Sequence, residues 1–274
     1  MVSRALSYLV VSALLYTQAV AVVFTFDCKK APGVCDTHCF ARSCAGIDWA
    51  HKGFHRDALA SSRQPKPNSK TTSNDLRRQA IGCVNSNPCS GGSTCDELPY
   101  ASTYDGGLGC VPQGFGGNSK DLYQQGVVHC VAGTENQVHG ALLNTFYNKE
   151  KIADGALFTV GLLNEASAPL CQALQKNKNS CPKQGDKGPP STKFYLARSA
   201  PDGTYCPGRA RASLNGPRSE DVDRREVVSK PARYAITDNG MRIREAVGEF
   251  SMGERVWSMS DDGIEITSTI VAFE

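Results

Sequence analysis

Residues 126–137 read GVVHCVAGTENQ and contain two kinds of pattern. The first half, residues 126–131, is a short apolar run rich in β-branched side chains, which is typical of a strand. In the second half, Thr134 and Gln137 have the spacing of a capping box, in which the two side chains bond the free backbone groups at a helix start. The segment therefore predicts a strand over 126–131 and, after it, a helix that opens at Thr134.

The helix that we expect after Thr134 carries Glu135 and Asn136 in its first turn. Its apolar stripe, read at a period of 3.6 residues, should face inward. The stripe consists of Val138, Ala141, Leu142, Thr145 and Phe146.

Further elements follow from similar local signals. A helix is expected with Ser73 or Asn74 as its N-cap and Gly82 as its C-cap. Apolar runs predict strands over 156–162 and 193–198. Two Gly-containing turns predict hairpins at 238–240 and 261–263. We expect an α+β fold: a small antiparallel sheet packed on helices, disulfide-rich, with a β-rich C-terminal extension.

The N-terminus has the pattern of a secretory signal. Arg4 precedes the apolar run 9–15, and residues 19–21 form a small-residue cleavage pattern. The run is too short for a membrane anchor. We expect a secreted, extracellular protein whose mature chain begins near Val22.

The 12 cysteines all follow that cleavage point. An even count in an exported chain predicts up to six disulfides, and spacing does not assign the partners. Zinc bound around Cys35, His38 and Cys39 is the rival interpretation, which an oxidising compartment disfavours.

The net charge of +3 falls to +2 when Arg4 leaves with the signal, with 29 basic against 27 acidic residues. This balance does not identify a nucleic-acid partner. Residues 42–78 carry eight basic against three acidic side chains. A polyanion docking on this segment and a charged, soluble linker over 61–73 are both open readings.

Two acidic segments suggest phosphodiester chemistry. Asp96 and Glu97 stand just before Pro99, and Glu135 and Asn136 stand at the expected helix start. Phosphodiester hydrolysis needs a base for water and a cation for the phosphate oxygens. Asp96 or Glu97 can be the base, and Glu135 and Asn136 offer the oxygen ligands that a hard cation prefers. The alternative is structural, because acidic residues also cap turns and favour helix starts.

Substrate contacts are expected from three basic side chains. Arg77 and Arg78 can bind a phosphate, and His139 lies one helical turn after Glu135 on the same face. A histidine base from the pair His129 and His139 is a second reading. A serine hydrolase is disfavoured, because the chain has no Gly-x-Ser-x-Gly motif.

These segments together resemble the secreted NucA/NucB-type deoxyribonucleases. The resemblance rests on motifs that agree in order and approximate spacing, and the Cys-rich N-terminal segment is similar to that of larger, fungal-type members. The motifs are DLRRQ at 75–79, CDELPYA at 95–101, DGG at 105–107, Glu135-Asn136 and DGALF at 154–158. In this family an aromatic residue stands where this chain has Leu98.

The resemblance implies a ββα-metal nuclease core that binds a divalent metal ion such as Mg²⁺, Mn²⁺ or Ca²⁺. It implies catalytic roles for Asp96, Glu97 and Glu135, with Asp96 as base, and metal binding by Glu135 and Asn136. The implied function is hydrolysis of DNA with low sequence specificity, with RNA left open as a substrate. We expect a monomer without a protein partner.

The alternatives are a non-catalytic secreted protein that binds nucleic acid or cell wall on a degenerate nuclease scaffold, and a secreted nuclease toxin or effector. The domain prediction has five parts. They are a signal peptide (1–21), a Cys-rich N-terminal segment and linker (22–72), a nuclease core (73–165), Cys-containing loops and a strand completing the core (166–215), and a β-rich extension (216–274).

Overall fold

The computed structural model describes most of the chain from residue 21 onward. The described residues are 21–45, 52–64, 70–83, 89, 91–109, 125–182, 194–198 and 232–274. Residues 1–20 of the predicted signal peptide, the segment 65–69, Cys110 and Cys206 lie outside them.

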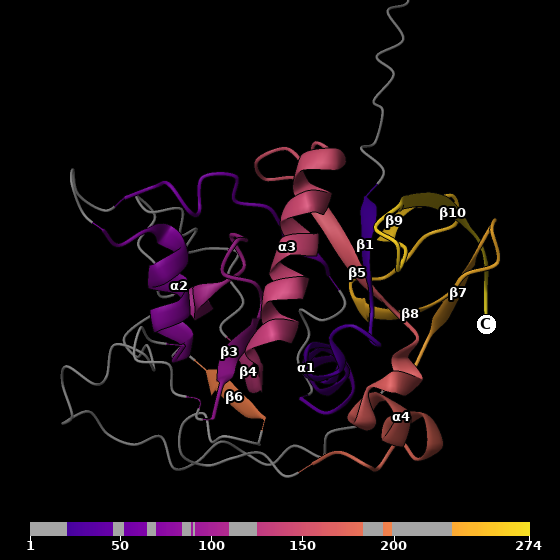
Figure 1. Ribbon diagram of the computed structural model, residues 1–274, viewed down its shortest axis with the longest axis horizontal. Helices are drawn as coiled ribbons and strands as arrows, with labels where there is room; N and C mark the ends of the chain where they lie inside the picture. The colour runs from indigo at the N-terminus through magenta and orange to yellow at the C-terminus, as the bar shows by residue number, and fades with distance from the viewer. Residues whose placement is uncertain are drawn as a thin grey trace, which may run out of the picture.

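Six strands close into a barrel. In order around it, they are β1 (Val22–Asp27), β9 (Arg255–Met259), β10 (Glu265–Phe273), β7 (Tyr234–Thr237), β8 (Arg242–Val247) and β5 (Leu157–Leu163). The barrel closes because β1 pairs in parallel with β5 on one side and with β9 on the other. A short strand, β2 (Phe54–His55), pairs antiparallel with the first two residues of β5. Figure 1 shows the C-terminal strands in yellow and orange beside the indigo β1.

The closed barrel shows that the predicted fold class is wrong. Both predicted C-terminal hairpins are present, between β7 and β8 and between β9 and β10. They do not form an extension to a small sheet, because β8 pairs with β5 and β9 pairs with β1. The barrel therefore combines strands from the beginning, the middle and the end of the chain, and it is the largest sheet of the described structure.

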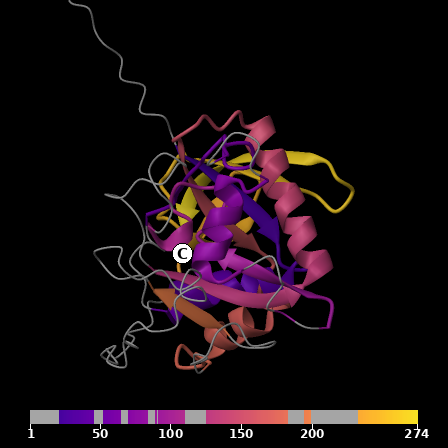
Figure 2. The same cartoon turned by 90° about the vertical axis from the view of Figure 1, so that its left-hand side faces the viewer.

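A second, three-stranded antiparallel sheet lies beside the barrel. Its order is β3 (Ser93–Leu98), β4 (Gln125–Ala132) and β6 (Tyr195–Arg198), with β4 in the centre. The long helix α3 (Gly133–Lys149) leaves β4 without a loop. Figures 1 and 2 both show the N-terminal end of α3 meeting β4. The short helix α2 (Ser73–Ile81) packs on one face of this sheet, where Ala80 and Ile81 join a cluster with Val128.

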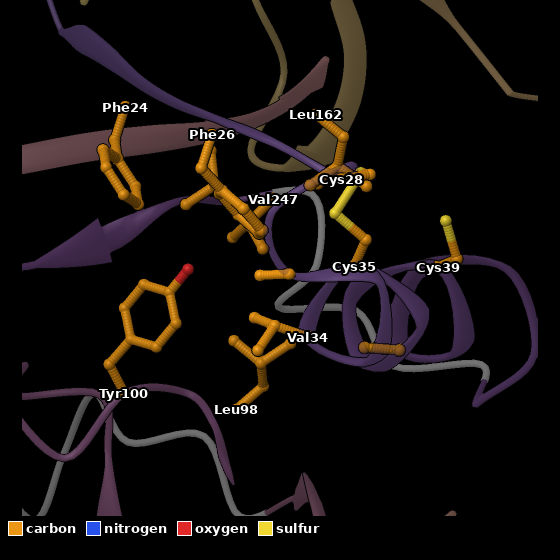
Figure 3. Close-up of a cluster of buried hydrophobic side chains, with 14 of the residues drawn as sticks. Phe24, Phe26, Cys28, Val34, Cys35, Cys39, Leu98, Tyr100, Leu162 and Val247 are labelled. Atoms are coloured by element: carbon orange, nitrogen blue, oxygen red, sulfur yellow. A yellow bond between two sulfur atoms is a disulfide. The ribbon is translucent and has the colours of Figure 1, made fainter. Parts of the chain in front are cut away.

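The helix α1 (Pro32–Ser43) connects the two sheets. At its C-terminal end, Arg42 binds Glu245 of β8 at 2.8 Å and the carbonyl oxygen of Gly248 at 3.0 Å. Figure 3 shows Val34 of α1 in one apolar cluster with Phe26 of the barrel and Leu98 of the small sheet. Helix α4 (Pro169–Lys176) packs on α1, and single 3-10 turns occur at Gly107–Gly109 and Glu165–Ser167.

The predicted helix α2 is present. Helix α3 is present too, but its first residue and the face that it buries differ from the prediction. Helix α2 covers the predicted residues and ends at Gly82, which has a φ of 99° that favours glycine. Its cap is Thr72, whose hydroxyl accepts from the Asp75 amide while the Asp75 side chain accepts from the Thr72 amide.

Helix α3 begins two residues earlier than expected, at Gly133 instead of Glu135, and Ala132 at its N-cap makes no side-chain bond, so the predicted capping box is absent. The predicted inward stripe is only partly right: Phe146 is buried, but Val138 is 37% exposed and Ala141 is exposed as well. The direct passage from β4 into α3 sets the rotation of the helix instead. Its buried residues are His139, Leu143, Phe146 and Tyr147.

Five disulfides are formed among the described residues. They are Cys28–Cys35, Cys39–Cys171, Cys44–Cys181, Cys83–Cys95 and Cys89–Cys130. Cys35, Cys39 and Cys44 are therefore oxidised, which excludes the zinc interpretation of that segment. In the described part of the chain, no helix is long and apolar enough to cross a membrane.

Candidate functional site

Asp96 and Glu97 point to opposite faces of the small sheet, because successive side chains of a strand alternate. Asp96 stands directly opposite His129 of β4, on the face that packs against α1. Glu97 faces α2, where its Oε1 lies 3.6 Å from the Nε of Arg78. Burial raises the pKa of Glu97 to about 8, against the lowering effect of the Arg78 charge. The two adjacent carboxyl groups therefore occupy separate environments.

The carboxyl group of Asp96 is buried and incompletely bonded. Asp96 is 3% exposed, and its Oδ2 has no hydrogen-bond partner among the described residues. Burial raises the pKa of Asp96 to about 7; the hydroxyl of Thr37 on α1 lowers it, and the charge of Glu135 raises it. An aspartate with this pKa can take up a proton near neutral pH.

Glu135 and Asn136 lie in the first turn of α3, beside Asp96. The Oε2 of Glu135 accepts a hydrogen bond of 2.6 Å from the backbone amide of Gly33 on α1. The Nδ2 of Asn136 donates to the Thr94 hydroxyl at 3.1 Å and to the Cys95 carbonyl at 3.0 Å. These bonds use one oxygen of Glu135 and the amide nitrogen of Asn136. Each side chain keeps one further oxygen, Oε1 or Oδ1, that can accept a ligand.

His129 completes the polar group around α1. Its Nδ1 lies 3.3 Å from the Gly33 carbonyl and 3.4 Å from the Thr37 hydroxyl, and its ring stacks on Phe194 at 4.2 Å. Burial lowers the pKa of His129, so the neutral ring is favoured. His129, Glu135 and Asn136 are all partly exposed, so the site meets solvent at the N-terminal end of α3.

Arg77 does not lie at this site. Its side chain is fully buried, and its Nη2 binds Asp57 at 2.7 Å while its Nη1 donates to the Ala101 carbonyl at 3.0 Å. Arg78 is more accessible, with 42% of its side chain exposed, but it lies on the Glu97 face of the sheet. The structure thus separates both predicted phosphate contacts from Asp96.

His139 lies in the aromatic core behind the site. It is 3% exposed, and its ring is 4.6 Å from that of Phe26 and 5.2 Å from that of Tyr100. Burial and the neighbouring His38 lower the pKa of His139 well below its ordinary value. A buried neutral ring of this kind does not meet a solvent-borne substrate. His139 therefore lies in the core, whereas His129 lies at the partly exposed edge of the site.

The basic segment 42–78 uses its arginines internally. All five of them contact acidic side chains or backbone carbonyls of this chain; they are Arg42, Arg56, Arg63, Arg77 and Arg78. This pattern favours a structural role for these residues over the docking of a polyanion.

The site residues that the sequence did not predict come from α1. Gly33 and Thr37 contact the candidate site although they precede it by more than 50 residues in the chain. One local signal was available, because Cys35 and Cys39 are four residues apart, the spacing of neighbours on one helical face. That signal predicts a helix, but nothing in it indicates what the helix packs against.

The donor set fits a hard cation that keeps much of its water. The described residues contain no group of three or more His, Cys, Asp and Glu side chains that could hold a metal ion. The remaining oxygens of Glu135 and Asn136 are hard ligands, and the buried Oδ2 of Asp96 has no partner among the described residues. Mg²⁺ is commonly held by one or two carboxylates together with waters and substrate phosphates.

Comparison with known families identifies the segment that contains this site. Residues 49–161 match the family described as Deoxyribonuclease NucA/NucB, which confirms the resemblance seen in the sequence motifs. The matched segment contains Asp96, Glu135 and Asn136 but ends before the C-terminal strands and begins after α1. The match supports a nuclease and, with it, DNA as the substrate. No curated protein and no solved structure gives a match.

Proposed function

We propose that the chain is a secreted, divalent-metal-dependent endonuclease that hydrolyses DNA with little sequence preference. Asp96 is the base, and Glu135 and Asn136 are the residues that hold the cation. The nuclease family match over 49–161 supports the reaction class. The observation that carries the assignment is the carboxyl group of Asp96, which is buried, lacks a partner at Oδ2 and has a pKa of about 7 beside Glu135.

In the proposed reaction, a water oxygen attacks the phosphorus and transfers a proton to Asp96 as the bond to the leaving sugar oxygen breaks. The raised pKa of Asp96 suits this transfer, because a base is most effective when its pKa lies near the working pH. A bound divalent cation would neutralise charge on the phosphate oxygens. Glu97 has no part in this proposal, since its side chain faces Arg78.

Secretion is supported by the five disulfides, which persist in oxidising compartments. Low sequence preference is proposed because contacts to phosphate carry no base information, and no base-reading motif is present in the sequence.

Plasmid nicking by the oxidised mature chain tests the proposal. We expect Mg²⁺ or Mn²⁺ to be required, EDTA to abolish cleavage, and Asp96→Asn to lose about 10²- to 10⁴-fold in kcat, the usual contribution of a general base. Glu97→Gln, the same change of carboxylate to amide one residue along, is expected to stay within about threefold, since Glu97 points to the opposite face of the sheet from Asp96 and lies beside Arg78. Cleavage that survives both EDTA and Asp96→Asn would refute the mechanism.

A second function, a non-catalytic nucleic-acid-binding protein on a nuclease scaffold, is favoured by one observation. Helix α1 packs over the Asp96 face, which leaves Asp96 only 3% exposed. Wild-type protein that binds DNA, has all its disulfides and does not nick plasmid with any divalent cation would establish this alternative.

A further inference from the structure

The contacts of α1 suggest more than a scaffold role for this helix. It precedes the family-matched segment 49–161, yet the backbone of Gly33 touches the candidate site twice. Its amide donates to Glu135 at 2.6 Å, and its carbonyl lies 3.3 Å from the Nδ1 of His129. Thr37, one turn later, is fully buried and lies between His129 and Asp96.

We infer that α1 is part of the nuclease centre, with Gly33 and Thr37 as positioning residues for Glu135 and Asp96. This inference rests on the proposed function. The residues of the site then come from two separate parts of the chain, one inside the matched segment 49–161 and one before it.

The role of Gly33 follows from geometry. A glutamate on the surface of a helix has several rotatable bonds, and ordering them costs free energy when a cation binds. The Gly33 amide fixes one oxygen of Glu135 before that event and leaves the other free. Hydrogen bonds from such outer residues to metal ligands typically contribute 10- to 100-fold to metal affinity or activity.

The close packing around Gly33 leaves little room for any side chain larger than the hydrogen of glycine. A Cβ added there would lie 3.0 Å from the Oε2 of Glu135 and 3.1 Å from the Cγ1 of Val131. Real Cβ atoms seldom come so close, and the flexible end of Glu135 is the group that can move away. Gly33→Ala should therefore displace the carboxylate while leaving the helix intact, since alanine favours helix.

Thr37 acts on the second carboxylate. Its hydroxyl can donate its single hydrogen either to Asp96 or to the Gly33 carbonyl 3.2 Å away, so it stands between the base and the backbone of α1. Valine has nearly the same shape without the hydroxyl, and serine keeps the hydroxyl without the methyl group. The two substitutions separate the hydrogen bond from the packing.

Direct Mn²⁺ binding to the full, oxidised mature chain tests the role of Gly33 without DNA. Electron paramagnetic resonance of free Mn²⁺ gives the affinity of the wild type, Gly33→Ala and the control Gly140→Ala. Gly140 is a helical glycine whose added Cβ would have no atom within 4 Å. We expect Gly33→Ala to weaken Mn²⁺ binding at least about tenfold and Gly140→Ala to leave it unchanged. Equal affinities of the two variants would overturn the inference, and so would a wild type that binds no Mn²⁺ at millimolar concentration.

Cleavage kinetics test Thr37. Thr37→Val should lower kcat about 10- to 100-fold with little change in KM, and Thr37→Ser should restore most of the loss. If serine is as damaging as valine, the methyl group is what matters and Thr37 is structural. A wild type that binds Mn²⁺ but cleaves no DNA refutes the proposed function alone, because the Gly33 comparison still reports on Glu135.

Discussion

Arg77 offers a sharp test of whether a conspicuous arginine of the DLRRQ motif binds substrate or holds the fold. Its guanidinium forms a 2.7 Å ion pair with Asp57, and both side chains are fully buried. Arg77→Met removes one charge of this pair and leaves Asp57 in the interior. The expected result is a loss of stability without a specific effect on DNA.

The size of that loss can be worked from the contacts. Removing one partner of a buried ion pair costs about 3 to 5 kcal/mol. Asp57 keeps a second cation, Arg63 at 3.0 Å, and a bond from the Leu59 amide at 3.0 Å. The lower end, about 3 kcal/mol, is therefore expected, and a protein of this size loses about 2 to 4 °C in Tm per kcal/mol, which gives about 6 to 12 °C.

Thermal unfolding of the oxidised protein measures the change, with Arg78→Met as the matched control. Arg78 is the next residue, its side chain is 42% exposed and its Glu97 contact is 3.6 Å. Such a pair contributes less than about 1 kcal/mol, so the Tm of this variant should stay within about 4 °C of wild type. Equal Tm values for the two variants would refute the buried-pair argument.

Salt dependence of DNA binding gives a second check on the same two variants. Removing a basic side chain that binds a DNA phosphate lowers the slope of log K against log salt by about one. Arg77→Met, studied well below its Tm, should keep the wild-type slope. A slope lower by about one would instead put Arg77 on the DNA backbone.

Two further predictions concern stability. Asp96 has a pKa of about 7 in the folded protein against 3.8 for the free side chain, so it ionises in the unfolded chain first, and its contribution to stability is lost as pH rises between these values. The Tm of Asp96→Asn minus that of wild type should therefore increase from about pH 4.5 to about pH 7.5, and a constant difference would contradict the burial of this carboxyl group. Disulfides that close long loops should matter more: Cys39–Cys171 has a sequence separation of 132 and Cys28–Cys35 one of 7. Replacing each pair by serine should cost about 5 and about 2.5 kcal/mol in urea unfolding, and equal costs would argue against the loop-entropy account.

Local sequence signals predicted several elements of this protein and the chemistry of its candidate site. The turn residues at 238–240 and 261–263 predicted two hairpins that the structure contains. The apolar run at 126–131 predicted a strand, and β4 covers it. The motifs around Asp96 and Glu135 resembled the NucA/NucB deoxyribonucleases, and the family match over 49–161 agrees. Each of these signals depends on residues close together in the chain.

The register of α3 shows where local reasoning fails. A capping box at Thr134 was a sound expectation, but β4 continues without a break into a helix that starts at Gly133. The preceding strand fixes the rotation of that helix, and as a result His139 points into the core and Val138 outward. The predicted substrate contact at His139 depended on the same rotation.

The sequence by itself determined the turns and the strand and helix propensities. It also determined the number of cysteines available for disulfides and the side chains that can take part in chemistry. Only the tertiary structure decided which strands close the barrel, where Val22 of β1 pairs with Arg255 of β9, and that α1 lies against Asp96. These choices depend on the burial of apolar surface between segments that lie far apart in the chain. The free energy of that burial is a property of both surfaces together, so neither segment contains the information alone.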